Sequence, residues 1–249
     1  MAALRAVGEQ DADGNWYVTG EKIFITSGHG KYHFVIARTE EADPNEPMSG
    51  LNGLSMFLVP TYEEDAGGNR TRIVQLSRVE EKLGHHGSAT CGLVFDKAPA
   101  ELVGQRGEGF KYMLTLMNNA RVGVGFECLG LSESAYRTAL EYAAERGSMG
   151  KSIDRHEMIA EYLETMKTEI QAQRAMAVAA CFHEEMAQKL AIELRYGDFD
   201  EASRADTERL LKSHQRKARR ITPLLKYFGA EKAVEHARTA LQIHGGNGY

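Results

Sequence analysis

The chain has 249 residues, of which 43% are hydrophobic and 26% charged, with 25 glycines and 5 prolines. This is an ordinary globular composition, which excludes a disordered or fibrous protein. No apolar run reaches roughly 18 residues, and Met1 is not followed by a secretory signal, so we expect no membrane span. The net charge of −5 disfavours binding to nucleic acid or to an anionic membrane as the main role.

The cysteines Cys91, Cys128 and Cys181 are odd in number and far apart. They predict neither a disulfide framework nor a metal cluster, and they fit a reducing, cytoplasmic compartment. His85 and His86 are adjacent, so they are either metal ligands or surface residues, and the second reading needs no further ligand. We therefore expect no metal.

Residues 1–107 have the pattern of a β-domain. They hold 10 Lys and Arg against 15 Asp and Glu, so the whole net charge lies in this part. Asp13 and Gly14 form a strong hairpin signal, because glycine tolerates positive φ. The segment Thr39–Gly53 is acidic and carries two prolines, so we expect a surface loop. Short apolar runs predict six strands in a small antiparallel sandwich or barrel, at Leu4–Glu9, Trp16–Ile25, His33–Arg38, Leu54–Pro60, Ile73–Val79 and Thr90–Asp96.

Residues 108–249 change to a helical period. Apolar residues recur at i, i+3, i+4 and i+7 from Phe110, which predicts a helix as far as Arg146. Three glycines inside it are tolerable where a neighbouring helix or a ligand comes close. A second helix is expected over His156–Leu190, and one or two more over Thr207–Ile243, with Pro223 as a possible break. The fold class is therefore α+β, an antiparallel β-domain followed by a bundle of long α-helices.

The residues alone do not reveal a reaction. No standard nucleophile, phosphate-loop or zinc motif occurs, and the glycine pattern at Gly104–Gly109 lacks the parallel strand of a dinucleotide site. Arg121 and Arg146 are either solvated charges or phosphate ligands. The glycines after His244 are either a helix cap or a close approach to another molecule. Phe24, Thr26 and Ser27 form either an ordinary turn or one edge of a ligand site.

Five segments taken together resemble the acyl-CoA dehydrogenases, a family of flavoproteins. Each segment is similar to a family motif, and the five occur in the family's order: Asn15–Gly28, Glu81–Thr90, Gly107–Phe110, Glu145–His156 and Gln242–Tyr249. The region Met186–Pro223 is longer than in short members and resembles the large subfamily that includes 3-methylthiopropionyl-CoA dehydrogenases.

The resemblance implies a middle β-domain over 1–107 and an incomplete C-terminal helical-bundle domain over 108–249. An N-terminal helical domain and the last helices would then be missing from this chain. The implied activity is FAD-dependent α,β-dehydrogenation of an acyl-CoA in fatty acid metabolism, in which a Glu takes the α-proton and a hydride passes to FAD. The implied partners are an electron-transferring flavoprotein and further copies in a homodimer or homotetramer. A eukaryotic member would reside in the mitochondrial matrix.

The resemblance also implies site residues. The FAD contacts would be Phe24, Ile25, Thr26, Arg146, Ser148, His156, Glu157, Gln242, Gly245 and Gly246, the last three reaching the FAD of a neighbouring subunit. The substrate contacts would be Asn118 and Arg121. Phe24, Met149 and Glu157 stand where the family more often has Trp, Phe and Gln.

No catalytic residue is expected within the chain. In most members the basic Glu follows the segment that ends here at Tyr249, and in a minority it precedes the helix arginine, where this chain has Ala120. The isolated chain should therefore not dehydrogenate an acyl-CoA. Two alternatives remain: an acyl-CoA oxidase, and a non-catalytic flavoprotein relative, towards which the basic run Lys212–Arg220 points.

Overall fold

A computed structural model describes residues 4–41, 45 and 49–248 of the chain. Its contacts form two compact units, residues 1–116 and residues 117–249, and each is described by itself. The domain limits expected at residues 107 and 108 stay a prediction. Among the described residues, no helix is long and apolar enough to cross a membrane.

The first unit contains the β-domain. A short helix, α1 (Ser49–Asn52), precedes β4. The strands are β1 (Val7–Gln10), β2 (Trp16–Thr26), β3 (Tyr32–Arg38), β4 (Leu54–Pro60), β5 (Tyr62–Glu64), β6 (Arg70–Arg72), β7 (Gln75–Val79) and β8 (Thr90–Val103).

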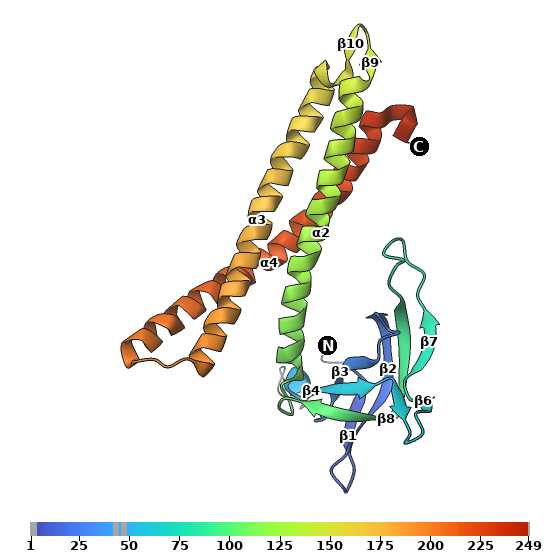
Figure 1. The fold of residues 1–249 in the computed structure, drawn as a ribbon, viewed down its shortest axis with the longest axis vertical. Helices are drawn as coiled ribbons and strands as arrows, with labels where there is room; N and C mark the ends of the chain where they lie inside the picture. Colours follow the sequence, from blue (N-terminus) through green and yellow to red (C-terminus); the bar gives the residue numbers. More distant parts are fainter. Residues whose placement is uncertain (1–3, 42–44, 46–48, 249) are drawn as a thin grey trace. The chain divides into compact units, whose positions relative to one another are not determined.

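Six of these strands form one sheet in the order β2-β1-β3-β4-β8-β7, and β2 also pairs with β8. The second pairing closes β2, β1, β3, β4 and β8 into a barrel (Figure 1), one of the two architectures that the sequence predicts. The pairings are antiparallel except for β1 and β3, which run parallel. Side chains on the inner face form the core, among them Val18, Val35, Phe57, Val59, Leu93 and Phe95.

The turn predicted at Asp13 and Gly14 joins β1 to β2. Gly14 has a φ of +88°, which explains why glycine stands there. The Asp11 carboxylate accepts hydrogen bonds from the backbone N–H groups of Asp13 and Asn15, at 3.0 and 2.8 Å. These bonds hold the turn and pin the register of β2, the strand that carries Phe24.

The β-domain departs from the sequence prediction in several places. The first strand begins at Val7 instead of Leu4, and a short helix, α1, lies within the expected loop Thr39–Gly53. The hairpin of β5 and β6 was not expected, because its residues are exposed and show no apolar alternation. The last strand continues past Asp96 to Val103, with Lys97 at a φ of +45° where it bends. The strand expected from Ile73 begins at Gln75. Within the expected loop Thr39–Gly53, residues 42–44 and 46–48 lie outside the described residues.

The second unit contains the helices. These are α2 (Gly109–Glu145), which begins in the first unit, α3 (Glu157–Tyr196) and α4 (Glu201–His244). Between α2 and α3 lie the hairpin β9 (Gly147–Ser148) and β10 (Lys151–Ser152) and the 3-10 turn η1 (Ile153–Arg155). A second 3-10 turn, η2 (Gly245–Gly248), follows α4.

Two helices extend beyond their expected ends. α3 continues past Leu190 to Tyr196, and α4 begins at Glu201 instead of Thr207. Asp200 caps α4, since its carboxylate accepts from the backbone N–H of Ser203 at 2.7 Å. Pro223 lies inside α4 and does not divide it. The lost hydrogen bond is tolerated where Thr222 and Leu225, on either side, are buried against the other helices.

The apolar contacts between the helices depend on one glycine of α2. A methyl group at Gly125 would lie 2.5 Å from the side chain of Leu225. Because glycine has no such methyl group, α4 can approach α2 closely at this point. At Gly123 and Gly130, no described atom lies within 4 Å of such a methyl group. Of these three glycines of α2, only Gly125 therefore shows the close approach that would explain a glycine inside a helix.

Candidate functional site

The end of α2 leads into a tight hairpin that presents Arg146. The Arg146 carbonyl accepts from the backbone N–H of Ile153 at 2.9 Å, which closes the base of the hairpin. Met149 and Gly150, at φ of +48° and +78°, form its two-residue turn. The Arg146 side chain is exposed and has no partner among the described residues. Its five N–H donors are therefore available to a ligand.

Ser148 and His156 are joined across this hairpin. His156 Nε2 donates to the carbonyl of Ser148 at 3.2 Å, because a carbonyl oxygen can only accept. Glu157 follows as the first residue of α3, where its carboxylate is stabilised by the positive end of the helix dipole. The structure thus brings Arg146, Ser148, His156 and Glu157 to one end of the bundle.

The C-terminal end of α4 lies at the same end of the bundle. The rings of Tyr142 and His244 stack with their centroids 4.6 Å apart, and the Tyr142 hydroxyl accepts from the side-chain amide of Asn247 at 3.2 Å. Tyr142 is one helical turn before Arg146. These contacts place the segment Gln242–Gly246 beside the end of α2. Gly245, at a φ of +55°, turns the chain away from the helix.

Asn118 and Arg121 form a separate pair in the first half of α2. Arg121 donates to the Asn118 side-chain oxygen at 3.1 Å, and both side chains are half-buried. An α-helix rises about 1.5 Å per residue, so Arg121 lies about 37 Å from Arg146 along α2. The two arginines cannot bind the same phosphate group, and the structure does not bring this pair to the end of the bundle.

Phe24 occupies a strained position in the β-domain. Its φ is +57°, a conformation that bulky residues rarely adopt, and its side chain is 65% exposed. The register between β2 and β8 shifts between Lys22 and Ile25, so Phe24 lies in a bulge. Such outliers occur mainly at binding sites, where they aim a side chain. Ile25 and Thr26 resume the pairing with β8 directly after it.

The turn after Thr26 is held by a neighbouring loop. The hydroxyls of Ser27 and Ser88 lie 3.3 Å apart, and the N–H of Gly28 donates to the carbonyl of Ala89 at 3.2 Å. In that loop, Lys82 Nζ donates to the carbonyls of His85 and Ser88, each at 2.7 Å. The two family-like segments of the β-domain are thus bonded to each other beside Phe24.

Lys22, two residues before Phe24, was not singled out by the sequence. Burial lowers the pKa of its amine to about 8, and no partner for the amine is found among the described residues. Tyr142 was missed as well. The sequence did offer a signal for Tyr142, because this residue lies one helical turn before an arginine and a glycine-containing hairpin follows that arginine. The sequence offers no comparable signal for Lys22.

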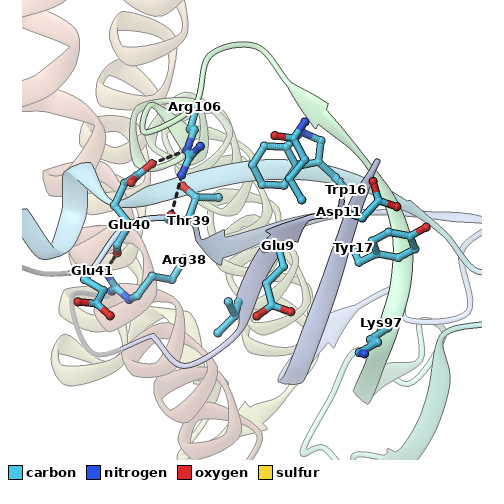
Figure 2. Close-up of a pocket in the computed structure, with 13 residues that line it drawn as sticks. Glu9, Asp11, Trp16, Tyr17, Arg38, Thr39, Glu40, Glu41, Lys97 and Arg106 are labelled. Atoms are coloured by element: carbon cyan, nitrogen blue, oxygen red, sulfur yellow. Dashed lines mark hydrogen bonds and ion pairs between the residues drawn. The ribbon is translucent and has the colours of Figure 1, made fainter. Parts of the chain in front are cut away.

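A hollow of about 1040 Å³ lies at another part of the β-domain. Figure 2 shows the residues that line it. Arg106 forms an ion pair with Glu40 there, donates to the carbonyl of Thr39 at 3.0 Å, and lies over the ring of Trp16. Its cation is therefore already neutralised. None of the residues predicted to bind cofactor or substrate lines this hollow.

The histidines expected to be either metal ligands or surface residues are both exposed. His86 Nε2 donates to the carbonyl of Lys82 at 2.6 Å, which uses one of its ring nitrogens. Within the described ranges, no group of three or more His, Cys, Asp or Glu could hold a metal ion.

Two family models match the sequence. The acyl-CoA dehydrogenase middle domain matches residues 1–98, and the acyl-CoA dehydrogenase C-terminal domain matches residues 107–194 and 201–249. This chain belongs to the acyl-CoA dehydrogenase family. The unmatched residues between the two C-terminal segments include the connection from α3 to α4.

Curated relatives of the family give the same result. The 3-methylmercaptopropionyl-CoA dehydrogenase of Ruegeria pomeroyi is 32% identical over 100% of this chain and 42% of its own length. The butyryl-CoA dehydrogenase of Syntrophomonas wolfei is 30% identical over 96% of this chain and 40% of its own length. The chain therefore spans less than half the length of these two relatives.

Solved structures share the fold. A chain from a study of the electron transferring flavoprotein of Acidaminococcus fermentans has a TM-score of 0.71 and 26% identity, over 100% of this chain and 55% of that one. An acyl-CoA dehydrogenase from Bacillus anthracis, solved with FAD, has a TM-score of 0.73 at 22% identity, over 98% of this chain and 38% of its own, and supports the fold alone. The expected β-domain with a helical bundle is thereby confirmed.

Proposed function

We propose that this chain contributes to an FAD-dependent acyl-CoA dehydrogenase that introduces an α,β double bond into an acyl-CoA thioester. The observation that carries the proposal is the meeting of two family-like segments at one end of the bundle. The Tyr142–His244 stack joins the Arg146 hairpin to the Gln242–Gly246 segment. The Arg146 hairpin presents exposed hydrogen-bond donors there, and the Gln242–Gly246 segment presents glycine backbone without side chains. Both features fit the binding of a pyrophosphate.

The residues present fit a flavin. Arg146 would clamp the pyrophosphate with its guanidinium fork, beside the Ser148 hydroxyl, with His156 and Glu157 in the next contact segment. Gln242, Gly245 and Gly246 would contact an FAD of a neighbouring subunit, in a homodimer or homotetramer. Glu157 brings a negative charge to this segment, which the dipole of α3 offsets in part.

In the β-domain, Phe24 would present its face and Ile25 its side chain to the flavin ring, and the Thr26 hydroxyl would donate a hydrogen bond near N5. The bulge and the positive φ that aim the exposed Phe24 side chain outwards support this role. FAD supplies the hydride acceptor when it is bound. The described residues would position it and exclude water from its face.

Asn118 and Arg121 would bind the CoA part of the substrate. Their mutual hydrogen bond fixes the guanidinium before any ligand arrives, which lowers the entropy cost of binding. We assign no catalytic base to this chain, because the methyl side chain of Ala120 cannot accept a proton. The names of the two curated relatives described above favour a thioether-containing or a short acyl group as substrate.

Electron-transferring flavoprotein is the proposed acceptor, and the likeness to a chain from a study of such a protein supports it. The alternatives are an acyl-CoA oxidase and a non-catalytic flavoprotein relative. Full-length protein reduced with butyryl-CoA separates them. Reoxidation by electron-transferring flavoprotein without oxygen consumption supports the dehydrogenase, rapid oxygen consumption supports the oxidase, and no flavin bleaching supports the non-catalytic relative.

The flavin site is tested with Arg146→Ala in the full-length protein, with Arg146→Lys and Arg137→Ala beside it. Arg137 is an exposed arginine of the same helix that is paired with Glu133. We expect Arg146→Ala to lose most of its flavin and to dissociate in size-exclusion chromatography, because a ligand shared between subunits stabilises their assembly. Arg146→Lys should retain only part of the flavin, and Arg137→Ala all of it. Full flavin occupancy at wild-type size in Arg146→Ala would reject the site.

A further inference from the structure

The end of β2 is strained at two positions. Phe24 and Ser27 have φ of +57° and +55°, a region that residues other than glycine rarely adopt. Such conformations raise the free energy of the folded protein, and they persist only where the surrounding structure holds them. This end of β2 therefore requires contacts with a neighbouring segment that fix its backbone.

The neighbouring segment is the loop between β7 and β8, residues 80–89, named here the β7–β8 loop. The loop ends where β8 begins, and Thr90, the first residue of β8, pairs with Thr26 in the sheet. In the turn after Thr26, the hydroxyl of Ser27 shares a hydrogen bond of 3.3 Å with the hydroxyl of Ser88. The β7–β8 loop thus contacts the strained end of β2 directly.

The contact between this loop and the turn is close. The N–H of Gly28 donates to the carbonyl of Ala89 at 3.2 Å. A methyl group at Gly28 would lie 2.5 Å from the Cβ atom of Cys91, so no side chain fits between the turn and the start of β8. A displacement of the β7–β8 loop would therefore displace the turn and the end of β2 as well.

Lys82 holds the β7–β8 loop in its shape. Its ammonium group donates to the carbonyls of His85 and Ser88, each at 2.7 Å, and bonds from a charged donor are stronger than those between neutral groups. The carbonyl of Lys82 accepts from His86 Nε2 at 2.6 Å. No residue of this loop is buried, so hydrogen bonds, and not apolar packing, fix its conformation. Ser88 links the two sets of contacts, because its carbonyl binds Lys82 and its hydroxyl contacts Ser27.

We propose that Lys82 is a positioning residue that fixes the end of β2 through the contact between Ser88 and Ser27. This inference rests on the proposed function, since Phe24 and Thr26 at this end are the proposed contacts of the flavin ring. Without the ammonium group, the β7–β8 loop loses two charge-assisted bonds. The strained backbone of β2 is then free to relax, which turns Phe24 away from its present direction.

The experiment uses the full-length protein as purified, with three variants. Lys82→Met removes the ammonium group at similar length, and Lys82→Arg restores a cation with several N–H donors. Lys31→Met is the matched control, because Lys31 is an exposed lysine of the same unit whose ammonium group has no partner among the described residues. The measurements are hydrogen exchange of residues 24–28, the absorption spectrum of the bound flavin, and the rate at which butyryl-CoA bleaches it.

In Lys82→Met, we expect exchange at residues 24–28 to become at least about tenfold faster, because the contacts that oppose local opening are weakened. The flavin should stay bound, since the pyrophosphate contact proposed for Arg146 does not involve this loop. Its absorption band should lose fine structure as water reaches the ring, and bleaching should slow by about tenfold, because the ring is no longer held in one orientation. Lys82→Arg should recover most of both properties, and Lys31→Met should match wild type.

Faster exchange confined to residues 80–89 would overturn the proposal, because Lys82 would then stabilise only its own loop. An unchanged flavin spectrum and bleaching rate in Lys82→Met would overturn it as well, while the proposed function would stand. A wild type that binds no flavin would reject the proposed function, and with it any role of Lys82 towards a flavin. If Lys82→Met does not fold, Ser88→Ala is used, which removes only the hydroxyl contact with Ser27 and should give a smaller change in the same direction.

Discussion

The stacked rings of Tyr142 and His244 join the end of α2 to the end of α4, with 4.6 Å between centroids and 24° between planes. His244 Nδ1 donates to the carbonyl of Ala240 at 2.7 Å, so the imidazole is held at a fixed orientation when the tyrosine packs on it. The proposed flavin contacts Arg146 and Gly245 flank this stack in sequence. The stack is therefore the packing contact that links the two segments of the proposed site.

Replacing Tyr142 tests this link. Tyr142→Leu removes the stack and the bond to Asn247, and we expect a loss of about 1 to 2 kcal/mol in the free energy of unfolding, with faster flavin release. Tyr142→Phe keeps the stack and should lose less than about 1 kcal/mol, because the bond to Asn247 is exposed. Thermal unfolding and flavin release after dilution measure both effects. Wild-type flavin retention in Tyr142→Leu would contradict the link.

The glycines of α2 should respond with opposite signs. Gly130→Ala adds a methyl group in open space and should stabilise the helix by up to about 1 kcal/mol, because alanine is the better helix former. Gly125→Ala drives that methyl group into Leu225 and should cost about 1 to 3 kcal/mol. Denaturant unfolding of both variants gives the comparison. Equal effects would mean that α4 does not approach α2 at Gly125.

The strain at Phe24 predicts an unusual preference for glycine. At a φ of +57°, Phe24→Gly should be more stable than Phe24→Ala by about 0.5 to 1 kcal/mol, because only glycine avoids the steric cost of this region. The neighbouring Ile23, also exposed and without positive φ, is the control. There the alanine variant should be the more stable one. The measurement is the melting temperature of the glycine and the alanine variant at each of the two positions. A more stable alanine variant at both positions would disprove the strained conformation.

How much the sequence revealed depends on how local each signal is. The hairpin at Asp13–Gly14 and the start of α2 at Gly109 follow from adjacent residues, and the structure has both. The β5–β6 hairpin lacked an apolar alternation, and the continuity of α4 through Pro223 depends on burial by other helices. The continuity of α4 thus depends on tertiary contacts, which periodicity does not encode, whereas the exposed β5–β6 hairpin is held by its own turn, in which the Asp65 carboxylate accepts from the N–H groups of Gly67 and Asn69.

The site shows the same division. The residues proposed for it come from the resemblance, motif by motif, whereas the contact between Tyr142 and His244 lies between residues 102 positions apart and has no local pattern. The positive φ of Phe24 was also invisible, because the sequence around it reads as an unbroken strand. Close packing and backbone strain are the parts of a site that a single sequence does not carry.

Lys22 gives the last prediction, which concerns pH. Burial lowers the pKa of its amine in the folded protein to about 8, from 10.5 in the unfolded chain. Between these values the unfolded state binds more protons, so wild-type stability should rise as the pH rises from 8 towards 10.5. Partial exposure reduces the gain in stability, which we place at about 1 to 2 kcal/mol.

Two variants test this pH dependence. Lys22→Met removes the buried charge, so it should be more stable than wild type at pH 7 and should show no such rise in stability with pH. Lys22→Arg remains charged throughout and should be less stable than Lys22→Met at every pH. Urea unfolding of the three proteins at pH 7, 8.5 and 10 measures the slopes, after subtraction of the dependence that all three share. Parallel curves for wild type and Lys22→Met would show that the Lys22 amine is hydrated in the folded protein.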